Sequence, residues 1–206
     1  MIKIFRDGIQ KLFRSGNVGA HLHALSSPAH NGATTAAFLA QGASYHGGTG
    51  INTWTTDADL LYAVPFVSPA RGGLLNMVSC PIASTGGDLR LGIYSNKDDH
   101  RNVYPDALLW GSEAIPVVTA DHAALSNIQL DPNRIYWAVL LTEQARTGAY
   151  DSSNYGASHL LGMAEAATTV IPRSITASHA FAALPDPFPA GGAFATPHPV
   201  LKLRYL

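Results

Sequence analysis

The chain has 206 residues, of which 47% are hydrophobic and 13% are charged, and its formal net charge is −1. This hydrophobic fraction is enough for a core and excludes general disorder, and the length fits one domain with or without an extended arm. The near-neutral charge gives no basic field for nucleic acid, so we expect no nucleic-acid partner. The charged fraction is about half of the ~25% usual in globular domains, which suits a protein packed against other proteins.

The single cysteine, Cys80, excludes an intrachain disulfide, and its neighbours Val78 and Ile82 predict a buried side chain. No hydrophobic run approaches the roughly 20 residues that span a bilayer, so we expect no membrane partner. Charged residues interrupt the N-terminus where the apolar part of a signal peptide would lie. We therefore expect a soluble chain that is made without a signal peptide.

The first 14 residues, MIKIFRDGIQKLFR, have the spacing of an amphipathic helix with basic side chains largely on its other face. Its apolar side chains are Ile2, Phe5, Ile9, Leu12 and Phe13. One reading is a short element that caps the protein's own fold, and another is an anchor that docks onto a neighbouring subunit. A basic segment of this length is marginal as a membrane binder. We favour the anchor because a tether-like stretch follows it.

Residues 15–58 are rich in turn formers and small residues, and they contain no persuasive long element. A compact domain rarely carries so long a structureless loop, so an extended arm lying on a partner would explain it, and so would disorder. An early, weakly specified strand between Gln41 and Trp54 is a further reading. We predict an N-terminal anchor and arm over residues 1–59 and a β-sandwich domain over residues 60–206.

From Leu60 onward, short strands alternate with turns. The predicted strands are Leu60–Val67, Leu74–Ile82, Leu89–Tyr94, Leu108–Trp110, Ala114–Val118, Ile128–Leu130, Ile135–Leu141, Ser174–Phe181 and Leu201–Tyr205. Pro65 indicates that the first of them is an edge strand, since proline cannot donate to a ladder. Residues 142–156 read as a polar loop, and residues 184–192 read as a proline-rich turn. The pattern predicts an all-β fold, an antiparallel β-sandwich of jelly-roll type with an extended N-terminal arm.

The strand Leu89–Tyr94 organises this prediction. Leu89, Leu91 and Ile93 alternate with Arg90, Gly92 and Tyr94, which is the signature of a half-buried strand. The apolar run Ile135–Leu141 is its expected neighbour in the core. In the last strand, Leu201, Leu203 and Tyr205 are expected to face inward.

Several spaced motifs resemble a β-sandwich module of tailed-bacteriophage virion proteins. They are LRLGIYSN followed by Tyr104-Pro105, the turn before Tyr136-Trp137, and LPDPFPAGG before the last strand. The resemblance covers about residues 60–206. It implies a virion structural protein, such as a capsid decoration, cement, tail or fibre component, with other capsid or tail subunits as partners. It further implies a homo-oligomer, assembled in the host cytoplasm and located in the virion, and no enzyme activity.

No cofactor or metal site is predicted. His21 and His23 would share one face of a strand, but zinc needs three or four ligands, and no cysteine or glutamate stands near them. The loop that contains Asp98, Asp99 and Asn102 offers oxygen atoms for calcium, yet basic residues interleave with them, so a solvated loop with internal ion pairs is preferred. No nucleophile elbow, P-loop or dinucleotide fingerprint is present, and no catalytic residue is assigned.

The aromatic residues divide by their place in the predicted strands. Trp137 and Trp110 fall in strands and are expected in the core. Tyr104, Tyr150 and Tyr155 fall in predicted loops and are candidates to face a ligand or partner. These loop aromatics support a second hypothesis, a module that binds a host receptor or surface glycan. A third hypothesis, a hydrolase, is supported only by scattered acidic residues, Glu113, Glu143 and Glu165.

Overall fold

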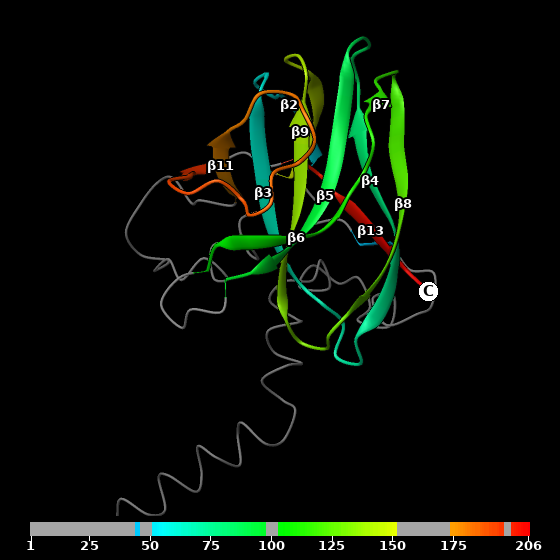
Figure 1. The fold of residues 1–206 in the computed structure, drawn as a ribbon. Helices are drawn as coiled ribbons and strands as arrows, with labels where there is room; N and C mark the ends of the chain where they lie inside the picture. Colours follow the sequence, from blue (N-terminus) through cyan, green and yellow to red (C-terminus); the bar gives the residue numbers. More distant parts are fainter. Residues whose placement is uncertain (1–43, 46–50, 98–102, 152–173, 196–198) are drawn as a thin grey trace, which may run out of the picture.

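The computed structural model describes residues 44–45, 51–97, 103–151, 174–195 and 199–206. The side chains of residues 44–45, 51–54, 120 and 149–151 lie outside this description. The strands are β1 (Ser44–Tyr45), β2 (Ile51–Thr55), β3 (Leu60–Val67), β4 (Gly73–Ile82), β5 (Asp88–Asn96), β6 (Pro105–Gly111), β7 (Ile115–Pro116), β8 (Ala120–Leu130), β9 (Ile135–Thr142), β10 (Thr147–Asp151), β11 (Ser174–Ser178), β12 (Ala193–Ala195) and β13 (Lys202–Tyr205). They form two antiparallel sheets packed as a sandwich, which confirms the predicted fold class (Figure 1).

The first sheet is built around β4. The strand β8 pairs with one edge of β4 along its whole length, from Gly73 opposite Leu130 to Ile82 opposite Ala120. The other edge of β4 is shared by β13, with β1 beyond it, and by β10, with β2 beyond it. Residues 44–55 of the predicted arm therefore contribute two strands to this sheet, at its edge opposite β8.

The second sheet has the order β12-β11-β3-β9-β5-β6, and the short β7 follows β6 along the free edge of β5. The expected pairing of β5 with β9 is present, with Leu91 opposite Leu140. The strand β3 is internal in this sheet, because β11 pairs with it as well as β9. The expectation of an edge strand holds for the second half of β3, from Val64 to Val67 and including Pro65, since the β11 ladder ends at Ala63.

The core between the sheets contains the residues that the alternating patterns of the strands predicted to face inward. Leu89, Leu91 and Ile93 are fully buried against the inward side chains of β4 and β13. Leu203 and Tyr205 of β13 are buried, as is Leu201 just before this strand, and all three were predicted to face inward. Burial of this apolar area is the main favourable contribution to folding.

A second hydrophobic cluster lies on the outer face of the second sheet. Its buried members include Tyr94, Trp137 and Val139 from β5 and β9, together with Leu184 and Phe188 from the connection to the last strands. That connection, residues 179–192, is called the cover segment here. It crosses in front of β3 and β9 in Figure 1. It contains the predicted proline-rich turn, and it forms a third layer over the sheet.

The cover segment corrects the prediction that Leu89–Tyr94 is half-buried. Tyr94 is 0% exposed although it points away from the core between the sheets. Gly92 on the same outer face lies under Leu184, and a Cβ at this position would collide with the leucine. Period-2 alternation therefore identified the inward face correctly, but it could not reveal that another part of the chain buries the outward face as well.

Candidate interaction surface

The predicted partner-docking residues Ile2, Phe5, Ile9, Leu12 and Phe13 lie outside the described residues, as does Tyr155. Tyr150 belongs to β10, which pairs with β2, and its side chain lies outside the description. Of the predicted loop aromatics, only Tyr104 can be placed in full.

The cover segment fixes the position of the partly buried side chain of Tyr104. Its hydroxyl group donates a hydrogen bond to the carbonyl oxygen of Pro189 at 2.7 Å and accepts one from the backbone N–H of Gly192 at 2.8 Å. Its ring meets the ring of Phe188 edge-on at a centroid distance of 5.8 Å. The side chain therefore positions the cover segment, and its hydroxyl group is already engaged within the chain.

The same segment is bound to β5 and β6 at three further points. The hydroxyl group of Tyr94 donates to the carbonyl oxygen of Pro185 at 2.7 Å. The carboxylate of Asp186 accepts from the backbone N–H of Leu108 at 3.0 Å, and the N–H of Phe188 donates to the carbonyl oxygen of Asp106 at 2.8 Å. Because a side chain of β5 and backbone groups of β6 supply these contacts, the cover segment belongs to the folded domain.

The residues Asp98, Asp99 and Asn102, which offer oxygen atoms for calcium, lie outside the described residues. Asn96 beside that loop, and Asp57 and Asp59, could also offer oxygen ligands, but each has a structural partner. Asn96 accepts a hydrogen bond from the indole N–H of Trp137 at 3.0 Å. Asp57 accepts one from the hydroxyl group of Tyr62 at 3.3 Å, and Asp59 accepts one from the N–H of Phe181 at 2.7 Å. Among the described residues, no three His, Cys, Asp or Glu side chains lie close enough together to hold a metal ion.

Cys80 is buried, as predicted, with 1% of its surface exposed. Burial raises the pKa of its thiol to about 12, and the nearby charge of Asp121 acts in the same direction. Only the thiolate reacts with a disulfide reagent. At about pH 8 we expect Cys80 in the folded chain to react with dithiobis(nitrobenzoate) about 10³-fold more slowly than in the urea-unfolded chain. Equal rates would contradict the burial.

Buried tyrosines predict a loss of stability at alkaline pH. Burial raises the pKa of Tyr62 to about 12, and it also raises the pKa of Tyr94. The unfolded chain loses these protons near pH 10, before the folded chain does. The free energy of unfolding should therefore be constant with respect to these groups below about pH 10 and fall as the pH rises toward 12. Urea titrations across this range measure the slope, and Tyr62→Phe should flatten it; an unchanged slope would contradict the assignment.

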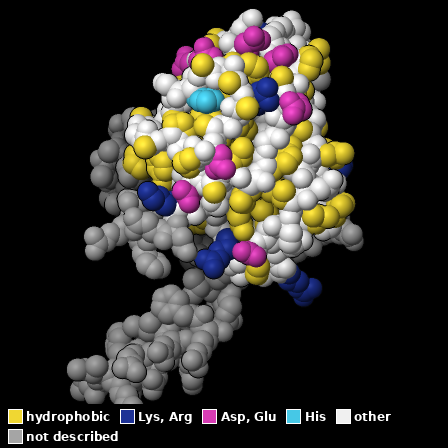
Figure 2. Space-filling model, viewed as in Figure 1, with side chains coloured by type: hydrophobic (Ala, Val, Ile, Leu, Met, Phe, Trp, Pro, Cys, Tyr) yellow, Lys and Arg dark blue, Asp and Glu magenta, His cyan; other side chains and the backbone are white. Residues whose placement is uncertain are grey.

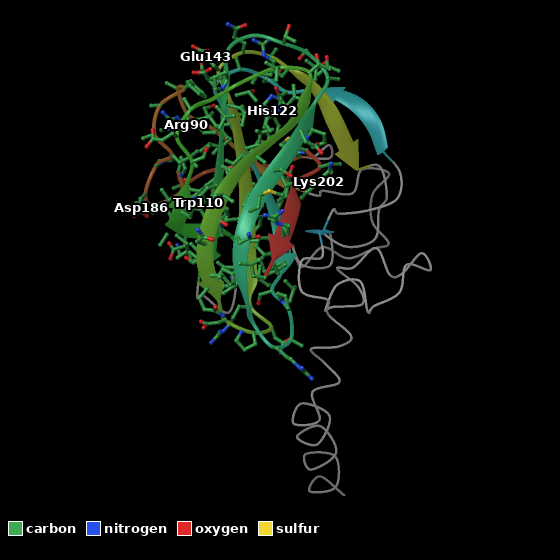
Figure 3. The ribbon with its side chains drawn as sticks, turned by 90° about the vertical axis from the view of Figure 1, so that its right-hand side faces the viewer. Arg90, Trp110, His122, Glu143, Asp186 and Lys202 are labelled. Carbon is green, nitrogen blue, oxygen red and sulfur yellow. The ribbon has the colours of Figure 1, made fainter. Side chains whose placement is uncertain are left out.

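An apolar surface lies along the side of the sandwich where β6, β7 and β8 form sheet edges. We call it the edge surface and define it by the exposed apolar residues of these elements, Leu109, Val118, Ala123 and Leu125, together with Trp110, which is partly buried against the core. Leu125 is 66% exposed, Val118 is 55% exposed and Leu109 is 44% exposed. Figure 2 shows hydrophobic side chains gathered on the molecule between β6 and β8, and Figure 3 looks onto this side, with Trp110 labelled.

The strand β8 is the main part of this edge. Among the described strands it pairs only with β4, so its second row of backbone groups has no strand beside it. Over its 11 residues the only Asp, Glu, Lys or Arg is Asp121. A bulge near Asn127, whose φ is 49°, interrupts the ladder once. A long edge with so little charge is a template for contact with another segment of protein.

The chain segment that carries most of the edge surface has acidic side chains and no lysine or arginine. Residues 103–130, which carry β6, β7 and β8, contain Asp106, Glu113 and Asp121 and no Lys or Arg. Two basic side chains reach this side from other strands. Lys202 of β13 bonds to Asp121 at 2.5 Å, and Arg90 of β5 lies 3.9 Å from Glu113. The alternation of apolar residues does not predict this surface, because β8 has no regular alternation. The low charge of residues 120–130 is the feature of the sequence that could have indicated it.

Within the described ranges, no helix has the length and hydrophobicity that are needed to cross a membrane. Comparison with known proteins adds no relative: no protein-family model matches the sequence, no curated protein matches it, and no solved structure matches the fold. The interpretation of this surface therefore depends on the chemistry of the chain itself and on the motif resemblance described above.

Proposed function

We propose that the chain is a non-enzymatic structural component of a bacteriophage virion. In this proposal a β-sandwich is attached to the particle through the N-terminal arm, as a capsid decoration, a cement protein or a tail or fibre component. The observation that carries the proposal is the edge surface, where an 11-residue strand edge with one charged side chain lies beside exposed Leu109, Val118 and Leu125. Apolar surface of this kind favours contact between protein subunits.

The positions of the motif residues support the same proposal. Tyr94 ends the LRLGIY run, Tyr104 precedes Pro105, and Trp137 lies in β9, and all three pack with Phe188 of the LPDPFPAGG run in one cluster. Motifs that are far apart in sequence thus specify one structural unit, the second sheet with its cover segment. Such motifs would mark a module of virion architecture, whereas a catalytic family would share reactive side chains.

The proposal predicts that removing residues 1–25 leaves a folded sandwich that no longer joins particles. The described strands begin at Ser44, so the deletion removes none of them, and the urea midpoint of the shortened chain should match that of the full chain. Its incorporation into particles, measured by quantitative blotting of purified virions, should fall to background.

A matched control is a full-length chain in which Ser15 and Asn17 are replaced with alanine. It keeps the apolar residues of the anchor, and it should be incorporated at the level of the natural chain. Normal incorporation of the chain that lacks residues 1–25 would refute attachment through this arm.

A further inference from the structure

We infer that, before assembly, residues 1–14 dock onto the edge surface of their own chain and cover the exposed edge of β8. This inference goes beyond the proposed attachment to a particle, because it concerns the free chain and names the surface that receives the N-terminal segment. The occupant is one segment of the same molecule, and the receiving residues are Leu109, Trp110, Val118, Ala123 and Leu125.

Among the described residues, the free edge of β8 is exposed and lacks the usual protection against contact with other strands. Proteins protect exposed strand edges with lysine or proline on the strand, with bulges, or with a helix or loop laid over the edge. The strand β8 contains no lysine and no proline. Its bulge near Asn127 lies toward one end, so the stretch from Ala123 to Leu125 stays open, with Leu125 66% exposed.

Residues 1–14 and the segment that carries the edge surface differ in the sign of their charge. Residues 1–14 contain four basic side chains and one acidic side chain, whereas residues 103–130 contain three acidic side chains and no Lys or Arg. The apolar stripe of the segment would face Leu109, Val118 and Leu125. Its basic face would lie near Asp106 and near the fully exposed side chain of Glu113, which Arg90 approaches only to 3.9 Å. Matched potentials of this kind raise both the rate and the specificity of docking.

The chain between residue 14 and β1 is long enough for residues 1–14 to reach the edge surface. The chain enters the first sheet at Ser44 in β1, and β13 and β4 separate β1 from β8. Three strand spacings amount to about 14 Å. A flexible chain of 29 residues, the number between Arg14 and Ser44, would have a root-mean-square span of about 30 Å. The segment can therefore reach its own edge surface, and a linked site of this kind has an effective concentration near the millimolar range. At micromolar chain concentrations the same chain outcompetes a second copy.

In the particle, the same segment would leave the edge surface for a neighbouring subunit, so that the anchor and the edge become available together. The two claims can fail separately. The deletion described above tests attachment to the particle, whereas docking in the free chain is tested without any particle.

The test is cross-linking in the full-length chain. One variant carries Gln10→Cys with Ala123→Cys on β8, and its matched control carries Gln10→Cys with Ala180→Cys, an exposed alanine beside β11. Cys80 is buried and does not compete for a short bis-maleimide. At low micromolar concentration we expect the first variant to form an intramolecular cross-link about tenfold faster than the control. Adding Lys3→Glu and Lys11→Glu should reduce this rate to that of the control.

Equal rates for the two cysteine pairs would overturn the inference. A product that is only dimeric would also overturn it, because it would place the segment on a second copy. A rate that does not change when the two lysines are replaced with glutamate would refute the contribution of charge to docking.

Discussion

Replacing Phe188 with alanine is expected to lower the free energy of unfolding by about 3–5 kcal/mol, the usual cost of removing a buried phenylalanine. Phe188 is 4% exposed, and its ring meets Tyr94 edge-on at 5.4 Å and Tyr104 at 5.8 Å. The substitution leaves a cavity under the cover segment between two tyrosine rings. A loss of this size from a residue in a proline-rich connection would show that the cover segment is part of the folded domain.

Urea unfolding followed by circular dichroism measures this difference. The matched control is Phe194→Ala on β12, where the side chain is 53% exposed and where we expect a change below about 0.5 kcal/mol. If both substitutions had the same small effect, the cover segment would contribute little to the domain, and the account of the third layer would be wrong.

Replacing Trp137 with alanine should have an effect of similar or larger size, about 3–5 kcal/mol from packing alone. Trp137 is 0% exposed and lies in β9 between Pro65 of β3 and Tyr94 of β5. Its indole N–H donates to Asn96 at 3.0 Å, so the substitution also removes a hydrogen bond that links β9 to the end of β5.

Trp137→Phe separates the two contributions. It keeps most of the apolar volume and loses the donor, and the freed oxygen of Asn96 is partly exposed and can bind water, so we expect a smaller loss than for alanine. Thermal unfolding of both variants provides the comparison. Equal losses would mean that the hydrogen bond, and not the packing, makes Trp137 important.

The sequence predicted the strands whose side chains alternate or form apolar runs. The prediction of Leu60–Val67 matches β3, and those of Leu74–Ile82 and Ile135–Leu141 match β4 and β9 within one residue at each end. In these strands burial on one or both faces leaves a pattern that can be read locally. The burial of Trp137 and Cys80 was predicted for the same reason, and it is confirmed.

Other elements left no such local pattern. Most of β8 was missed because ADHAALSNIQL is largely small or polar, and its strand character comes from pairing with β4, about 50 residues earlier. The strand β10 lies in a segment read as a polar loop, and it is held by pairing with β2. Propensity is overridden in these places by tertiary pairing.

The roles of the aromatic residues also depend on distant contacts. Tyr104 falls beside a polar loop and looks available to a ligand, yet its hydroxyl group bonds to residues more than 80 positions later in the chain. The edge surface is likewise a product of topology, because it arises where β6 and β8 end different sheets. A single sequence contains these apolar residues, but it does not show that they are exposed or that two sheet edges meet on one side.

We propose that this sandwich binds subunits of a virion through its N-terminal arm. The most direct measurement is the position of the chain in an intact particle, determined by electron cryomicroscopy of purified virions. The account predicts density for the sandwich on the particle, with residues 1–25 in contact with a capsid or tail subunit. A particle that lacks the chain, or that holds it by the sandwich alone with residues 1–25 touching no other subunit, would contradict the account.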